Sequence, residues 1–350
     1  MLNQYMPVGL PDVTKGNKQE LLALLLQEEY GTIPAAPYEV VATVKKIDRK
    51  FCAGKAELQT LRLHCQAEWG EFSFPVYYVR PLNPEKPVPC FVHINFRDLV
   101  PDKYQPTEEL VDEGYAVLTF CYQDVSSDDG DFTNGLAGVV YPGGVRTEEQ
   151  CGKIGLWAWA ACAVLRYALT LPELDSEKIS VVGHSRLGKT ALLAGALEER
   201  FYCAFSNDSG CSGAALARGT TGETIADIMR RFPYWFCERY GRYINREEEL
   251  PFDQHYLLAA NLPHRVYVAS ARGDAWACPE WEYLSCVAAS PYYEQRGRMG
   301  FVHPERMPLV GECLHEGHIG YHIRDGLHYL SREDWRYYIQ YLKKHSLFNY

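Results

Sequence analysis

The sequence lacks the features of a membrane protein, a zinc site or a disulfide scaffold. No stretch reaches the roughly 18 continuous apolar residues that a membrane-spanning helix needs, and the start, MLNQYMPVGLPDVTKGNK, has no apolar segment behind a basic one. The 12 cysteines are irregularly spaced and contain no CxxC pair. We therefore expect reduced cysteines in the core, no metal, no cofactor and no membrane partner. We expect a cytoplasmic location, or a secreted one if a leader has been trimmed.

A dense run of Lys and Arg is also absent. With 45 acidic and 35 basic residues the formal net charge is -10, which repels a nucleic-acid backbone on average. Hydrophobic residues make up 47% of the 350 positions and charged residues 23%, so the chain is able to bury a large core. These numbers predict a globular protein that does not bind nucleic acid, and they leave its oligomeric state open.

No internal repeat or low-complexity linker divides the chain, so we expect a single domain over residues 1–350. Residues 1–37 are predicted to form an N-terminal helical extension. Its leucine-rich pattern, Lys18 to Gly31, is helical and ends at a glycine.

The remaining pattern changes from alternating strands to a βαβ rhythm near Pro89. Antiparallel strands are predicted at 38–47, 57–67 and 72–79, followed by strands at 90–95, 115–122, 176–183, 201–207 and 265–271. Helices are predicted at 107–113, 148–171, 187–197 and 332–344. We expect an α/β fold with a mostly parallel central sheet, antiparallel N-terminal strands and helices on both faces.

The segment VVGHSRLGKTALLAGA (181–196) follows a predicted strand and fits two chemical templates. As GxxxxGK[ST], Gly183, Gly188, Lys189 and Thr190 form a phosphate-binding loop. As a nucleophile elbow, Gly183-His184-Ser185 lifts a serine hydroxyl above the sheet, although Leu187 stands where that template has its second glycine.

Context favours the elbow. A phosphate loop usually follows an early strand, whereas about five strands precede this one, and we find no strand ending in a magnesium-binding aspartate. An acid and then a histidine follow the serine in the order of a serine hydrolase. Ser185 is therefore predicted to be the nucleophile, with N-capping as its structural alternative.

The motifs resemble those of the glucuronoyl esterase family of carbohydrate esterases, especially its bacterial branch. The matching blocks after His93 are GHSRLGK, SNDSGCSGAAL, FPYWF, LPFDQH, VYVASARGDAWACP and IGYHIRDGLH. The resemblance implies an α/β-hydrolase fold and a carbohydrate ester as substrate.

His328 is the predicted base, since it lies in the loop RDGLHYL before the last helix. His318 and His322 are close in sequence but fall in or beside the apparent strand GHIGYHI. His184, next to the serine, is predicted to pack beneath the elbow.

Two carboxylates compete to orient this histidine. Asp274 follows the strand VYVASA, and Asp208 follows an earlier strand at SNDSG. Members of the family carry the acid at either position, and the earlier one is commonly glutamate. We name Asp274 first and keep Asp208 as the alternate acid.

The resemblance also assigns residues that surround the ester. It implies that Arg186 contributes to the oxyanion site, that Lys189 binds sugar hydroxyls and that Trp276 stacks on a pyranose ring. Glu223 is a further candidate acceptor for a sugar hydroxyl. The FPYWF run (232–236) is expected mainly to pack in the core.

Four functions remain open at this stage. The first is a serine-type carboxylic ester hydrolase acting on small carbohydrate esters, of the glucuronoyl type, through a Ser-His-Asp acyl-enzyme mechanism. An acetylxylan esterase of the same fold, a P-loop nucleotide-binding enzyme and a catalytically silent carbohydrate-binding relative are the alternatives.

Overall fold

A computed structural model describes residues 2–346, and its centre is one ten-stranded sheet. In spatial order the strands are β1, β2, β3, β5, β4, β6, β7, β8, β10 and β9. Their bounds are β1 Glu39–Lys50, β2 Ala56–Ala67, β3 Gly70–Pro81, β4 Val88–Asn95, β5 Ala116–Cys121, β6 Leu174–His184, β7 Cys203–Asn207, β8 Arg265–Ala271, β9 Cys313–Leu314 and β10 Ile319–Arg324.

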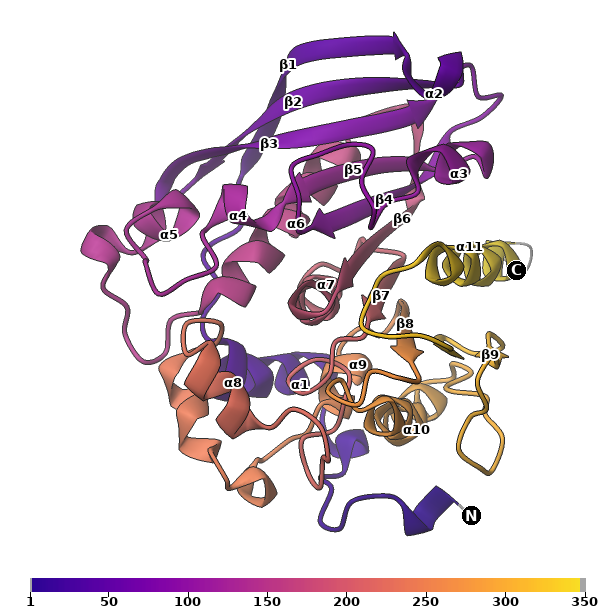
Figure 1. Cartoon of the computed structure of the whole chain (residues 1–350). Coiled ribbons are helices and arrows are strands. Elements are labelled where there is room, and N and C mark those ends of the chain that lie inside the picture. Colours follow the sequence, from indigo (N-terminus) through magenta and orange to yellow (C-terminus); the bar gives the residue numbers. More distant parts are fainter. Residues whose placement is uncertain (1, 347–350) are drawn as a thin grey trace.

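Six neighbouring strands, β5, β4, β6, β7, β8 and β10, run parallel. The N-terminal strands β1, β2 and β3 pair antiparallel and extend one edge of the sheet, where Figure 1 shows them in indigo and purple. The predicted division into an antiparallel start and a parallel centre is therefore confirmed. Since parallel strands end at the same edge of a sheet, the loops after β6, β7, β8 and β10 are brought together.

Helices cover both faces of the parallel region (Figure 1), as predicted. Alternate residues along the central strands face two separate cores. Val181 of β6 belongs to the larger core under the helices α6, α7 and α10, and its neighbour Val182 to the smaller core under α3 and α11. The helices are α1 Lys18–Leu25, α2 Phe51–Gly54, α3 Thr107–Asp112, α4 Tyr122–Val125, α5 Gly135–Val140, α6 Lys153–Ala168, α7 Arg186–Leu197, α8 Ile225–Arg231, α9 His255–Ala259, α10 Pro279–Gln295 and α11 Arg332–Ser346.

The helix α6 is shorter than the predicted range 148–171. Residues before Lys153 are drawn into backbone pairing with the N-terminal segment instead. The Thr32 N–H donates to the carbonyl of Glu149 at 2.7 Å, and the Cys151 N–H donates to the carbonyl of Thr32 at 3.2 Å. This pairing uses the carbonyl of Glu149 and the N–H of Cys151, which an earlier helix start would have used within the helix.

The N-terminal helical segment is part of the core. The helix α1 begins with a capping box between Asn17 and Glu20, and a π-helical turn, Leu26–Tyr30, continues it to Gly31. Leu21, Leu25 and Tyr30 are buried in the larger core. Residues 1–37 were predicted as an extension, and in the structure this helical part packs as an internal element.

Ten of the 12 cysteine side chains are buried and two are partly exposed. They lie where small apolar residues pack, in agreement with the prediction of core cysteines. Within residues 2–346, no helix combines the length and the apolar character required to cross a lipid bilayer.

Candidate active site

Ser185 stands on a sharp turn between β6 and α7. Its backbone has φ 58° and ψ −128°, a strained conformation for a residue with a side chain. The turn is held to the next strand because the Ser185 N–H donates to the carbonyl of Asn207 at 2.8 Å. Gly183 is required here, since a Cβ on it would overlap the carbonyl of Leu187. This geometry is that of a nucleophile elbow.

The second glycine of the elbow is displaced by one position. The Leu187 side chain is fully buried in the larger core. Gly188 faces β7, where an added Cβ would lie 3.0 Å from both Ser206 Oγ and Ser209 Cβ. The close approach of helix and strand is therefore made at residue 188, and Leu187 does not disrupt the turn.

The phosphate-loop interpretation of the same segment does not fit the structure. The helix α7 begins at Arg186, directly after the serine, so no open loop surrounds a phosphate. The Lys189 ammonium is buried and donates to the carbonyls of Ser209 (2.6 Å) and Cys211 and to Glu223 Oε2 (3.2 Å). All three of its donors already have partners.

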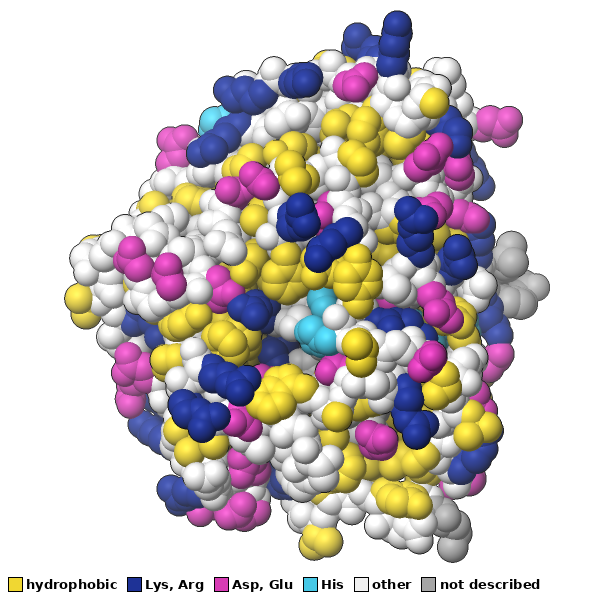
Figure 2. Space-filling view, viewed as in Figure 1, with side chains coloured by type: hydrophobic (Ala, Val, Ile, Leu, Met, Phe, Trp, Pro, Cys, Tyr) yellow, Lys and Arg dark blue, Asp and Glu magenta, His cyan; other side chains and the backbone are white. Residues whose placement is uncertain are grey.

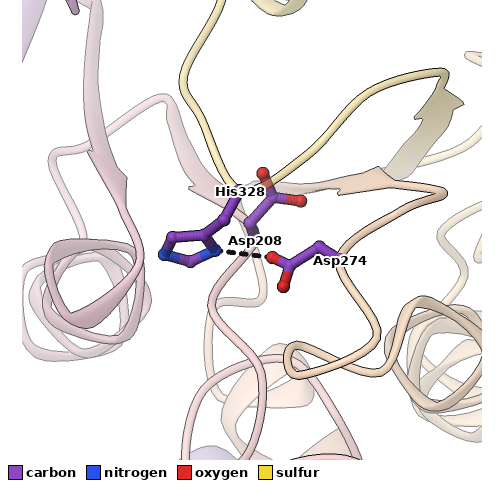
Figure 3. A group of neighbouring side chains, drawn as sticks. All are labelled: Asp208, Asp274 and His328. Carbon is purple, nitrogen blue, oxygen red and sulfur yellow. Dashed lines mark hydrogen bonds and ion pairs between the residues drawn. The ribbon is translucent and has the colours of Figure 1, made fainter.

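His328 and Asp274 form the hydrogen bond expected of a base and its orienting acid. His328 Nδ1 lies 2.5 Å from Asp274 Oδ2 (Figure 3). The histidine is 42% exposed, whereas Asp274 is buried. They come from the loops after the neighbouring strands β10 and β8, and the Gly273 N–H donates to the carbonyl of Gly326 between those loops at 2.8 Å.

Asp208 is close to the pair but is engaged elsewhere. One ligand atom from each of Asp208, Asp274 and His328 lies within 4.8 Å of the others, yet the only hydrogen bond drawn among them joins His328 to Asp274 (Figure 3). Asp208 has a left-handed φ of 45°, and its Oδ1 accepts the Ala271 N–H at 2.7 Å. Burial raises the pKa of Asp208 well above its usual range, and the carboxylate of Glu282 raises it further.

Ser185 and His328 line the same pocket, which also brings together the residues predicted to bind the substrate. Figure 2 shows a hollow with a histidine, basic side chains and hydrophobic side chains at its border. The lining residues are Ser185, Arg186, Lys189, Asp208, Ser209, Gly210, Glu223, Arg231, Phe232, Trp235, Trp276, Ala277 and His328.

Arg186 is held in place by an acid and an aromatic ring. Its Nη1 donates to Asp128 Oδ2, and its guanidinium carbon lies 4.5 Å from the centroid of the Trp235 ring. Asp128 Oδ1 in turn accepts the Trp235 indole N–H at 2.8 Å. The arginine that follows the serine therefore has a fixed position at the pocket wall.

A chain of polar contacts links the remaining predicted residues. Glu223 accepts from Lys189 through Oε2 and from the Trp276 indole N–H through Oε1 at 3.1 Å. Trp276 is 41% exposed, and the Arg231 guanidinium lies 4.7 Å from the centroid of its ring. Lys189, Glu223 and Trp276 thus form one connected wall of the pocket, called the polar wall below.

The other histidines near His328 in sequence have structural partners. His322 is buried on β10, between the hydroxyl of Tyr267 (2.9 Å) and the carboxylate of Asp334 (2.9 Å). His318 Nδ1 lies 3.2 Å from the carbonyl of Met299. Neither lines the pocket.

Sequence reasoning missed several residues of the site. Phe232 and Trp235 of the FPYWF run line the pocket, while Trp235 and Phe236 also belong to the larger core, as expected for that run. Arg231 and Asp128 were not singled out either. Because Asp128 lies 58 residues before Arg186, no local pattern signals their ion pair.

A serine on a strand–turn–helix elbow, followed in chain order by an aspartate and a histidine on the loops of neighbouring parallel strands, defines the class of protein. The chain has the α/β-hydrolase fold.

Comparison with known proteins specifies the family. The family model described as "Glucuronyl esterase, fungi" matches residues 64–297, more than half of the chain. The chain belongs to the glucuronoyl esterase family, which confirms the resemblance seen in its motifs.

Three relatives illustrate the match. Carbohydrate esterase MZ0003, from an unknown prokaryotic organism, is 39% identical over 240 residues, which cover 68% of this chain and 55% of that protein. A promiscuous CE15 esterase from the marine bacterial metagenome is 29% identical, with a TM-score of 0.84 and coverage of 96% of both chains. A glucuronoyl esterase from Solibacter usitatus is 28% identical, with a TM-score of 0.85 and coverage of 95% of this chain and 97% of that one. The chain thus spans about half the length of the curated relative that it matches.

Proposed function

We propose that this protein hydrolyses carboxylic esters of carbohydrates, with glucuronoyl esters as the preferred class, through a covalent acyl-enzyme. The observation that carries the proposal is that Ser185 and His328 line one pocket, with His328 hydrogen-bonded to Asp274 behind it. Family membership supports the substrate class, since the matching family model is that of glucuronyl esterases.

The first half of the reaction forms the acyl-enzyme. Ser185 Oγ attacks the ester carbonyl carbon while His328 Nε2 takes the hydroxyl proton. Asp274 accepts a hydrogen bond from Nδ1–H, which fixes the tautomer and stabilises the imidazolium. The imidazolium then gives its proton to the departing alcohol oxygen as the C–O bond breaks.

The second half releases the acid. His328 removes a proton from a water molecule, which attacks the acyl carbon, and then returns that proton to Ser185 Oγ as the acyl–serine bond breaks. The products are a free carboxylic acid and an alcohol, and the enzyme is regenerated.

Negative charge develops on the carbonyl oxygen in both halves, and two groups of Arg186 are placed to stabilise it. Its backbone N–H opens the first turn of α7, where helix donors and dipole favour an anion. Its guanidinium lines the pocket beside the serine. Because Asp128 and Trp235 already hold that guanidinium, little reorganisation accompanies the reaction.

The polar wall supports a sugar acid as the acyl part of the ester. In a glucuronoyl ester the reacting carbonyl is attached directly to the pyranose ring, so the ring hydroxyls lie within a few bonds of the attacked carbon. The Glu223 carboxylate has lone pairs left to accept hydrogen bonds from such hydroxyls, Lys189 holds Glu223 in place, and Trp276 offers an apolar face for the ring. A plain acetyl group has no hydroxyls to use these groups.

A hydrolysis panel tests the proposal. We would compare benzyl glucuronate, acetylated xylo-oligosaccharides and p-nitrophenyl acetate, and label the protein with a fluorophosphonate. The proposal predicts stoichiometric labelling of Ser185 and the highest kcat/KM on benzyl glucuronate. Higher kcat/KM on the acetylated oligosaccharides would make the protein an acetylxylan esterase, and failure of both labelling and turnover would make it a silent relative.

A further inference from the structure

We propose that Arg324 is the positioning residue that holds the His328 loop in its working conformation. The proposal rests on the proposed function, in that His328 is taken as the base. It adds a residue that is not itself among the residues lining the pocket.

Arg324 is the last residue of β10, and its guanidinium lies beneath the loop that carries His328. The side chain is 4% exposed. Nη1 donates to the carbonyl of Asp325 at 3.1 Å, and Nη2 donates to the carbonyls of Leu327 (3.2 Å) and Tyr329. One side chain therefore satisfies backbone acceptors on both sides of His328.

The guanidinium is itself fixed by two buried carboxylates. Its Nε lies 2.9 Å from both oxygens of Asp334, and its Nη2 lies 3.4 Å from Asp208 Oδ2. Asp334 is anchored at the start of α11, where it accepts the Ser331 N–H at 2.6 Å, and it also contacts His322 of β10. The arginine thus ties the loop to a strand and a helix.

The side chains of the loop are mostly exposed, and its backbone is also held by the Gly273 N–H, which donates to the Gly326 carbonyl at 2.8 Å, and by the Tyr329 N–H, which donates to Asp208 Oδ2 at 3.4 Å. Asp325 and His328 are exposed, and the Leu327 side chain is 71% exposed. Gly326 has a φ of 116°, and a Cβ added to it would lie 2.7 Å from Arg324 Nη1. The glycine therefore allows the guanidinium to pass directly under the turn.

Asp208 takes part in the same arrangement. Its Oδ2 accepts weakly from the Tyr329 N–H and from Arg324, both at 3.4 Å, and its Oδ1 accepts the N–H of Ala271, the last residue of β8, which leads into the loop that carries Asp274. The alternate acid position thus links the acid loop with the histidine loop, and Arg324 completes the link. A shift of the histidine by about 1 Å is enough to cost a catalytic step roughly 10²-fold.

The test compares Arg324→Lys with Arg218→Lys. Lysine keeps the charge but lacks the fork that reaches three carbonyls. Arg218 is a matched control, because it is equally buried at 4% exposure, pairs with Asp253 at 3.0 Å, donates to the carbonyls of Phe252 and Leu250, and lies outside the pocket lining. For each protein, kcat and KM on p-nitrophenyl acetate, the rate of fluorophosphonate labelling and the melting temperature would be measured, with kcat expressed per folded molecule.

We expect Arg324→Lys to lower kcat and the labelling rate about 10- to 100-fold while KM stays within about threefold. Arg218→Lys should lower the melting temperature similarly and leave kcat within about twofold of wild type. The inference is overturned if folded Arg324→Lys keeps kcat within twofold, or if Arg218→Lys loses kcat equally. Wild-type protein that neither labels nor turns over any ester would instead refute the proposed function.

If Arg324→Lys does not fold, Gly326→Ala replaces it. That change leaves the buried ion pair in place and pushes the turn away from the guanidinium. It should lower kcat at least about tenfold at nearly constant KM, and a kcat within twofold of wild type overturns the inference.

Discussion

The imidazole rings of His184 and His328 lie against each other with their centroids 4.4 Å apart, although one side chain is buried and the other stands at the pocket mouth. Burial lowers the pKa of His184 to about 3, and the charge of His328 contributes to that lowering. A neutral His184 donates its Nδ1–H to Asn207 Oδ1, 2.6 Å away. In the proposed mechanism, the imidazolium of His328 would therefore face an uncharged ring.

We expect His184→Phe to affect stability more than catalysis. The change keeps an aromatic ring beside His328 but leaves the buried Asn207 carbonyl without its donor, which costs about 1–3 kcal/mol. Urea unfolding at pH 7 measures this loss, and kcat should fall less than about tenfold. A kcat loss above a hundredfold at unchanged stability would place His184 in the chemistry instead.

Replacement of Ser185 by alanine should abolish ester turnover without unfolding the chain, because it removes only a partly exposed hydroxyl. In serine hydrolases the remaining site retains about 10³–10⁴ over the uncatalysed reaction. Steady-state kinetics on benzyl glucuronate, with circular dichroism as the control for folding, measure the effect. A variant that kept more than a tenth of the wild-type kcat would show that another residue is the nucleophile.

Replacement of Asp274 and of Asp208 by asparagine should lower kcat by very different amounts. Asp274→Asn removes the charge that faces the His328 Nδ1–H and should lower kcat about 10⁴-fold. Asp208→Asn leaves that hydrogen bond intact and only weakens the link between the loops, so we expect about a tenfold loss. Kinetics under matched conditions separate the two, and the reverse ranking would assign the acid to the earlier strand.

A buried carboxyl group outside the pocket lining predicts a pH-dependent stability. Burial raises the pKa of Glu29 to about 8, and the side-chain amide of Gln254 contacts it at 3.1 Å. The folded state then binds more protons than the unfolded state between pH 4.5 and 8, so Glu29 lowers stability progressively as the pH rises through this range. Gln254 Oε1 is buried without a hydrogen-bond partner among the described residues. A glutamine side chain at position 29 would be uncharged and could donate a hydrogen bond to this oxygen.

Glu29→Gln should therefore raise the melting temperature at pH 8 and change it little at pH 4.5. The gain at pH 8 corresponds to an unfolding free energy on the order of 1 kcal/mol or more. Thermal melts of both proteins at several pH values between 4.5 and 8 measure the difference. An equal difference at every pH would show that the carboxyl group does not titrate in this window.

The sequence was sufficient to predict most strands of the parallel sheet and the meeting of Ser185 with His328, whereas the helix α10 (Pro279–Gln295) was not predicted. Both predictions depend on local patterns, since an elbow motif and a histidine loop each occupy a few consecutive residues. The apolar runs of the strands then place the two loops at one edge of the sheet. The glucuronoyl esterase resemblance rested on the same local blocks. The cytoplasmic location and the catalytic roles stay predictions.

The choice between the acids was not readable from the sequence because it depends on side-chain direction. Asp208 turns toward the Ala271 N–H through a left-handed backbone conformation at a non-glycine residue, which has no sequence signal of its own. Lys189 is another example, since its partners Ser209, Cys211 and Glu223 are 20 to 34 residues away. Arg324 offered one clue, a charged residue ending the apolar strand IGYHIR.

The N-terminal helical segment shows that the region matched by the family model and the region that folds begin at different residues, although these two boundaries are usually assumed to coincide. The family model matches the chain from residue 64, yet the Tyr30 hydroxyl donates to the carbonyl of Ser212 at 3.0 Å and the Gln254 amide donates to Glu29, so both contacts join the N-terminal segment to residues far along the chain. A protein trimmed to the recognisable region would lose β1 and expose the larger core beneath α1. The region that the family model matches is thus smaller than the unit that folds. The first thirty residues have to be included in any gene fusion or transfer that is meant to produce a folded protein.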